Sequence, residues 1–167
     1  MENQKGYTLI ELILTIIVVG IIAAVSAQIL MRGIDSYNFI MNRKDAVQHA
    51  RVGMDRMLEE LLLVRSIDII SAGDTQVSFW DYSGASVNFR RYTVNNVWQL
   101  YRKDDFLAGS VAFLDFDYYN SSNQATSLAW SVRRINIELT VQALGGAGSV
   151  PVRCEVFPRN FMYSNFQ

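Results

Sequence analysis

The stretch that decides the fold is Lys5-Gly6-Tyr7-Thr8-Leu9-Ile10-Glu11-Leu12, which opens an apolar run that continues to about Leu30. A helix satisfies its own backbone hydrogen bonds in lipid, and roughly 20 apolar residues suffice to cross the hydrocarbon. The run from Leu9 to Met31 meets that length, so we expect a transmembrane helix. The carboxylate of Glu11 is costly in lipid and therefore points to a partner.

Two simple interpretations of this run have to be weighed. A secretory signal would use Lys5 as its basic region and Val25-Ser26-Ala27 as its cleavage site. The length of the run and Glu11 count against it, because a secretory apolar region spans about 7–15 residues. A plain single-pass anchor stays open, since Glu11 near the membrane surface can extend its side chain to water.

The segment Gly6-Tyr7-Thr8-Leu9-Ile10-Glu11-Leu12 resembles the prepilin signal of type IV pilins and type II secretion pseudopilins. The resemblance implies that a prepilin peptidase cuts after Gly6 and that the new N-terminus, Tyr7, is methylated. The family usually has Phe at this first mature position. The resemblance also implies that Glu11 is an assembly contact, paired with the terminal amine of a neighbouring subunit. Such pairing lowers the cost of both charges in lipid.

The same resemblance implies a bacterial inner-membrane protein with a cytoplasmic N-terminus and a periplasmic C-terminal domain. Lys5 favours that orientation independently, by the positive-inside tendency. The implied partners are other pilin or pseudopilin subunits, the prepilin peptidase, the inner-membrane assembly platform and membrane lipid. Small residues four apart, which let helices pack closely in lipid, are Gly20 with Ala24 and Ala23 with Ala27.

The composition fits one modest domain behind this segment. The chain has 167 residues, 15 of them Lys or Arg and 16 Asp or Glu, so the net charge is −1 and no basic field points to nucleic acid. Cys154 is the only cysteine, which excludes an internal disulfide. No cofactor is expected.

We expect the helix to run from Thr8 to about Ser66, because no proline interrupts it. Its second half is amphipathic, and Gly33 and Gly53 each cost it about 1 kcal/mol relative to Ala. The expected apolar stripe is Ile40, Val47, Ala50, Met54, Met57, Leu61 and Val64. The expected divisions are a cleaved leader at 1–6, the transmembrane and assembly half of the helix at 7–31, its amphipathic half at 32–66, and a β-rich periplasmic domain at 67–167.

The remaining residues are rich in strand formers and alternate between apolar and polar. Expected strands cover 76–82, 86–94, 97–102, 111–119, 135–142 and 150–157. Asn95-Asn96, Phe106-Leu107 and Gly145-Gly146-Ala147-Gly148 are expected turns, and most of the strand aromatics are expected in the core. The predicted fold class is therefore α+β, with a long N-terminal helix packed on an antiparallel β-sheet.

The side chains that could carry chemistry are few. His49 lies among helical charges and is interpreted as solvated or at an interface, and Cys154 as a buried apolar residue. Asp115 and Asp117 share a strand face and are weak candidates for a metal site, because calcium takes six or more oxygen ligands. No triad, P-loop or zinc spacing is present in the sequence, so we expect no enzyme.

A looser resemblance concerns the subclass. The segments 54–61 and 116–120, Trp130 followed by 133–137, and the segment 158–161 are similar to J-type minor pseudopilins and related minor pilins. That similarity implies a low-copy subunit at the filament tip, which primes assembly. A major pilin is the rival within the family. A membrane-anchored periplasmic binding domain that forms no filament is the rival outside it.

Overall fold

The computed structural model describes residues 8–65, 68–81 and 83–158, and these divide into two units, Met1–Ile40 and Met41–Gln167. One helix, α1 (Leu9–Leu61), supplies residues to both units. The structure does not test the predicted boundaries of the leader, at 1–6, or of the transmembrane half of the helix, at 7–31. Each unit is described below by itself.

In the first unit, every described residue from Thr8 to Ile40 is exposed. This part of α1 includes a window that is long and apolar enough to cross a membrane, with none of its side chains buried. Large apolar side chains such as Leu9, Ile17 and Val19 are more than half exposed. Such a surface is unstable in water, and it therefore needs lipid or other apolar helices around it.

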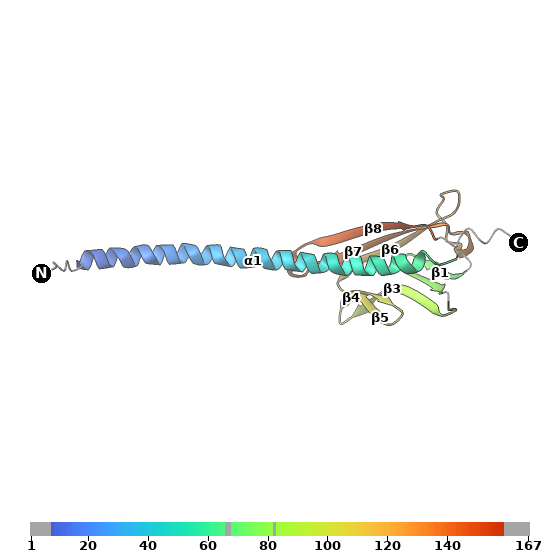
Figure 1. Ribbon diagram of the computed structural model, residues 1–167, viewed down its shortest axis with the longest axis horizontal. Helices are drawn as coiled ribbons and strands as arrows, with labels where there is room; N and C mark the ends of the chain where they lie inside the picture. The colour runs from blue at the N-terminus through green and yellow to red at the C-terminus, as the bar shows by residue number, and fades with distance from the viewer. Residues whose placement is uncertain (1–7, 66–67, 82, 159–167) are drawn as a thin grey trace. The chain divides into compact units, whose positions relative to one another are not determined.

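The second unit combines the last part of α1 with two antiparallel sheets (Figure 1). The first sheet has the order β1-β2-β3-β4-β5 and the second the order β6-β7-β8. Their strands are β1 (Ile69–Gly73), β2 (Gln76–Trp80), β3 (Ser86–Val94), β4 (Val97–Arg102), β5 (Asp105–Ala108), β6 (Val111–Tyr119), β7 (Arg134–Gln142) and β8 (Ser149–Val156). Two short 3-10 helices are η2 (Ala129–Ser131) and η3 (Leu144–Gly146). The predicted α+β class and the helix-on-sheet packing are confirmed, but the single sheet was wrong.

One hydrophobic core joins the helix to both sheets. From α1 it takes Ala46, Ala50, Gly53, Met54, Met57 and Leu61. The apolar stripe is thus confirmed from Ala50 onward, whereas Val47 is half-buried and Ile40 is 63% exposed. The buried stripe begins at Ala46, six residues or nearly two turns after the predicted start at Ile40.

The alternation of apolar and polar residues located most of the strands correctly. On β7, Ile135, Ile137, Leu139 and Val141 are each at most 1% exposed, while the residues between them are partly exposed. Asn95 and Asn96 adopt φ values of 49° and 63°, as the two-residue turn between β3 and β4 requires. The predicted strand at 76–82 ends at Trp80, and Tyr82 lies outside the described residues.

The end of the helix and one predicted turn lie at other residues than the sequence predicted. The helix ends at Leu61 rather than near Ser66, which lies outside the described residues; Leu63 and Val64 donate to the carbonyls three residues back. This tighter turn brings Val64 into the core, where it is 3% exposed. Phe106 and Leu107 are not a turn but part of β5, because the chain reverses at Lys103, whose φ is 53°.

At Gly53, α1 approaches the sheets closely. A Cβ at this position would lie 2.9 Å from Leu100 Cδ2, 3.4 Å from Leu139 Cδ2 and 3.5 Å from Ala108 Cβ. These neighbours belong to β4, β7 and β5, so a single glycine lets both sheets pack against the helix. The helix propensity lost at this glycine is offset by the close packing that it permits.

Replacing Gly53 by Leu should destabilise the protein by about 2–3 kcal/mol, because the new side chain would displace Leu100 and Leu139 from their packed positions. Gly53→Ala should change stability by less than about 1 kcal/mol, since better helix propensity offsets the shift of Leu100. Thermal unfolding of the detergent-solubilised full chain measures both. Gly33→Leu is the control, because nothing lies within 4 Å of a Cβ there. Equal stability of Gly53→Leu and wild type would contradict the close approach.

Candidate functional site

The start of α1 is the first candidate site. Gly6 and Tyr7, the predicted cleavage and methylation positions, lie outside the described residues. Glu11 lies in the first turn of α1 and is exposed. Among the described residues its carboxylate has no cationic partner. The expected pairing with a neighbouring subunit therefore remains a prediction.

Glu11 also has a local role that the sequence analysis missed. Its backbone N–H donates to the Thr8 carbonyl at 3.1 Å and to Thr8 Oγ1 at 3.4 Å. Thr8 followed three residues later by Glu is the sequence signature of a capping box, in which the first hydroxyl caps the helix. An acidic side chain in the first turn is further stabilised by the helix dipole. The Thr8-x-x-Glu11 spacing was the signal that could have revealed this.

The small residues of the membrane segment share one side of α1. Gly20, Ala24 and Ala27 follow each other at intervals of four and three, and all three are exposed. Nothing lies within 4 Å of a Cβ built on Gly20. A neighbouring helix has room to approach there, but no contact in the described residues tests this packing role.

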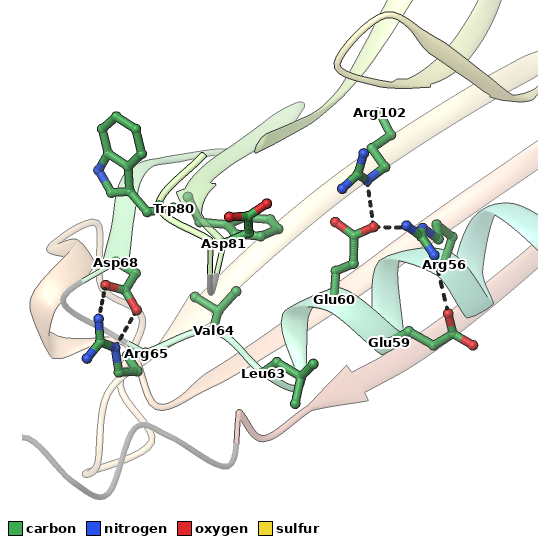
Figure 2. Close-up of a pocket in the computed structure, with 12 residues that line it drawn as sticks. Arg56, Glu59, Glu60, Leu63, Val64, Arg65, Asp68, Trp80, Asp81 and Arg102 are labelled. Atoms are coloured by element: carbon green, nitrogen blue, oxygen red, sulfur yellow. Dashed lines mark hydrogen bonds and ion pairs between the residues drawn. The ribbon is translucent and has the colours of Figure 1, made fainter. Parts of the chain in front are cut away.

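The second candidate is a cavity of about 760 Å³ in the second unit, shown in Figure 2. Glu60 accepts from Arg56 Nε at 2.7 Å and from Arg102 Nε at 2.5 Å, so one carboxylate bridges α1 and β4. Trp80 and Asp81 line the cavity from the end of β2. The three bridged side chains satisfy one another, and this arrangement stabilises the packing of helix on sheet rather than holding a reactive group.

The segment that follows α1 also lines this cavity and carries a second ion pair. Arg65 donates from Nε and Nη2 to the two oxygens of Asp68, at 2.6 and 2.9 Å (Figure 2). The hydrogen bonds to Asp68, together with its negative charge, raise the pKa of Arg65. Asp81 accepts from the N–H and hydroxyl of Ser83 and from the N–H of Ala85, and these bonds lower the pKa of Asp81. Both acids therefore hold local turns in place.

His49 and Cys154 show no catalytic setting in the described part of the chain. His49 is exposed on α1, and its ring meets Phe106 edge-on with centroids 6.3 Å apart. Cys154 was predicted to be buried but is half-buried, because β8 is the edge strand of its sheet. Its Sγ lies 3.7 Å from the Glu155 carbonyl, a weak hydrogen bond.

Most of the strand aromatics are not in the core, contrary to the prediction. Among the described strand aromatics, Phe79, Phe89, Phe116 and Tyr118 are buried. The exposed ones are Trp80, Tyr92, Trp98, Phe106 and Phe113, and Tyr101 and Tyr119 are partly exposed. Trp130, in η2, is exposed as well. The reason is that many occupy outward positions of strands, where they contact one another. Tyr101, for example, meets Tyr92 and Phe106 edge-on at 6.3 and 6.2 Å.

Asp115 and Asp117 lie on the outer face of β6, as predicted, while Leu114 and Phe116 point into the core. Asp115 stands opposite Glu138, whose carboxylate accepts from Arg153 at 2.8 Å. Burial and the negative charges of Asp117 and Asp74 raise the pKa of Asp115. Among the described residues no group of three or more His, Cys, Asp or Glu side chains is placed to hold a metal. The pair therefore gains no third acidic, His or Cys ligand from that part of the chain.

Asp115→Asn should raise the free energy of unfolding near pH 7 by about 0.5 kcal/mol, because it removes a carboxylate that faces like charges. A raised pKa means that the folded state binds the proton more tightly than the unfolded state, so stability falls as pH rises through that pKa. The benefit should therefore vanish toward about pH 3, where Asp115 is protonated in both states. Urea unfolding near pH 7 and near pH 3 measures the free energy of unfolding, with Asp55→Asn as the control. A benefit independent of pH would contradict this account.

The comparisons with known proteins concern the N-terminal segment. Residues 1–27 match the family model described as the prokaryotic N-terminal methylation motif. No curated protein matches the chain. The match includes Gly6, Tyr7 and Glu11, and it ends within the exposed apolar part of α1. The first 27 residues are thus the type IV pilin and pseudopilin signal, and the chain that carries them has a pilin-like α+β architecture.

Proposed function

We propose that this chain is a structural subunit that assembles with other pilin-like subunits into a type IV pilus-like filament or a type II secretion pseudopilus. The observation that carries the proposal is the methylation motif at residues 1–27, continuous with an apolar helix whose described residues are all exposed. A helix with this surface is suited first to lipid and then to neighbouring helices. The function is assembly rather than catalysis.

The proposed processing follows from the motif. The prepilin peptidase cleaves after Gly6, and Tyr7 becomes the methylated N-terminus. Glu11 then pairs with the terminal amine of a neighbouring subunit, and Gly20, Ala24 and Ala27 allow close packing of the helices. Because Glu11 is exposed and lacks a cationic partner in the described residues, its carboxylate is available for this contact.

The proposed topology places the N-terminus in the cytoplasm and the second unit in the periplasm, until the subunit is drawn from the inner membrane into the filament by the assembly platform. Within the family we propose a minor subunit of the J-type kind, which primes assembly or caps the tip. The scattered sequence similarity at 54–61, 116–120, 133–137 and 158–161 supports that subclass.

Intact mass of the membrane-extracted protein tests the proposal. With the cognate prepilin peptidase present, the chain should begin at Tyr7 and be heavier by one methyl group. Without the peptidase it should begin at Met1. A chain that begins at Met1 in both cases would indicate a plain anchor, and one that begins at Gln28 would indicate a secretory signal.

Glu11→Val separates a filament subunit from an anchored binding domain. We expect the variant to insert in the membrane as well as wild type but to lose at least about tenfold in co-purification with sister subunits, since the charge pair is worth a few kcal/mol in lipid. Cross-linking of the variant to sister subunits in membranes, followed by their co-purification, measures this loss of assembly. Thr15→Val, another polar residue of the same helix segment, is the matched control. Unchanged assembly of Glu11→Val would argue against the pairing.

A further inference from the structure

The sheet of β6, β7 and β8 (Figure 1) has one face in the core and one face outside it. Phe116 of β6 and Ile137 of β7 point into the core and are each 1% exposed, so their chain neighbours lie on the outer face. The strand register brings these neighbours together in rows across the sheet. Two adjacent rows of the outer face are Asp117-Asn136-Glu155 and Asp115-Glu138-Arg153.

These two rows line a hollow of about 550 Å³, which we call the acidic hollow. Two of its four carboxylates have a cationic partner. Glu138 accepts from Arg153 at 2.8 Å, and Glu155 accepts from Arg134 at 3.4 Å. The other two, Asp115 and Asp117, make no ion pair with any described residue. The unbalanced negative charge of the hollow is therefore on the two β6 carboxylates.

Asn136 adds a third acceptor to the acidic hollow. Its side chain lies opposite Asp117 and lines the hollow with both β6 carboxylates. The Asn136 Oδ1 atom is buried, and no group in the described part of the chain donates a hydrogen bond to it. A buried acceptor without a donor is costly, and most such atoms in proteins have a partner. This atom therefore points, independently of the acids, to a donor that comes from another molecule.

A further carboxylate adds to the negative charge beside the acidic hollow. Asp74 lies in the turn between β1 and β2 and lines, together with Asp117, a neighbouring cavity of about 260 Å³. Burial raises the pKa of Asp115, and the charges of Asp117 and Asp74 raise it further. A cation that enters the hollow would relieve this repulsion.

The number of free acceptors favours an ammonium group over a metal ion. Calcium takes at least six oxygen ligands, and no group of three or more described His, Cys, Asp or Glu side chains is placed to hold a metal. A lysine ammonium is a compact charge with three N–H donors. Three side chains of the hollow offer free acceptors to it, namely Asp115, Asp117 and Asn136.

We propose that the outer face of the sheet β6-β7-β8 docks a sister subunit through a lysine, whose ammonium group enters the acidic hollow and donates to Asp115, Asp117 and Asn136 Oδ1. A protein is favoured over a small amine because the rim is open to solvent: the side chains of Arg153 and Glu155 are 76% and 52% exposed. Small-molecule sites instead enclose most of their ligand. The inference rests on the assembly given under Proposed function, and goes beyond it by naming the surface and the chemistry of the partner.

The first test measures how much sister subunit stays bound to the detergent-solubilised full chain after co-expression. We expect Asp115→Asn with Asp117→Asn to lower the retained amount by about tenfold at low salt, because both charges of the contact are lost. The matched control is Asp104→Asn with Asp105→Asn, two exposed acids at the turn between β4 and β5, which should change nothing. The Asn substitutions at Asp115 and Asp117 remove mutual repulsion, so a loss of binding does not come from unfolding, and equal thermal unfolding temperatures check this.

The second test identifies the lysine. A carbodiimide joins a carboxylate and an amine that touch, with formation of an amide and uptake of the released water by the reagent. In membranes that contain the full chain and its sister subunits, mass spectrometry should find an amide between Asp115 or Asp117 and a lysine of a sister subunit. Asn136→Leu keeps both carboxylates but removes the third acceptor, and should lower the yield of this amide by about threefold.

Three results would overturn the lysine contact. One is unchanged retention of sister subunits by the Asp115→Asn, Asp117→Asn variant. Another is an amide only to proteins that are not pilin-like subunits. The third is calorimetric binding of calcium chloride by the wild-type chain that the same variant loses, which would assign the acidic hollow to a metal ion. If wild-type protein retains no sister subunit at all, the assembly given under Proposed function fails, and this inference fails with it.

Discussion

The structure depends on the difference between the two parts of α1: the second part is buried against the sheets, and the first part is exposed. Residues 46–61 of α1 bury an apolar stripe against two sheets, whereas residues 8–40 have no described neighbour that covers them. Burial of apolar surface is the main favourable term in folding, so the first part of the helix gains its stability from lipid or from other chains. The second unit has its own hydrophobic core, whereas the first part of the helix has none among the described residues.

How much of this could be read from the sequence depended on whether a local pattern existed. The alternation of Ile135, Ile137, Leu139 and Val141 predicted β7, because one face of that strand is buried and the other is wet. β1 and β5 were missed since each is short and its partner is needed to define it. The helix end at Leu61 was missed because the apolar run continues through Val64, and only the tertiary core decides where it turns.

The candidate sites also divide into those that a local sequence pattern predicted and those that it did not. The segment from Gly6 to Leu12 was recognisable because order and spacing of residue types carry its meaning, and the motif match agrees with that interpretation. Glu11 nevertheless has a local backbone contact with Thr8 that the assembly hypothesis did not require. The Arg56–Glu60 pair has the i,i+4 spacing of a helical ion pair, but its extension to Arg102 joins residues far apart in sequence and could not have been foreseen. The outward aromatics could not be separated from the core ones without the register of the strands.

The close packing around Gly53 has a mechanical consequence. Leu100, Ala108 and Leu139 occupy the space where a side chain would stand, while Ala50 and Met54 flank the glycine along the helix. If α1 slid along its axis, these flanking side chains would be forced against Leu100 and Leu139, and the charge bridge at Glu60 would stretch at the same time. A pull applied along the helix is therefore borne by interlocked packing and by an ion bridge together. The filament assembly proposed above, in which the helix leaves a membrane, would load the subunit in this direction.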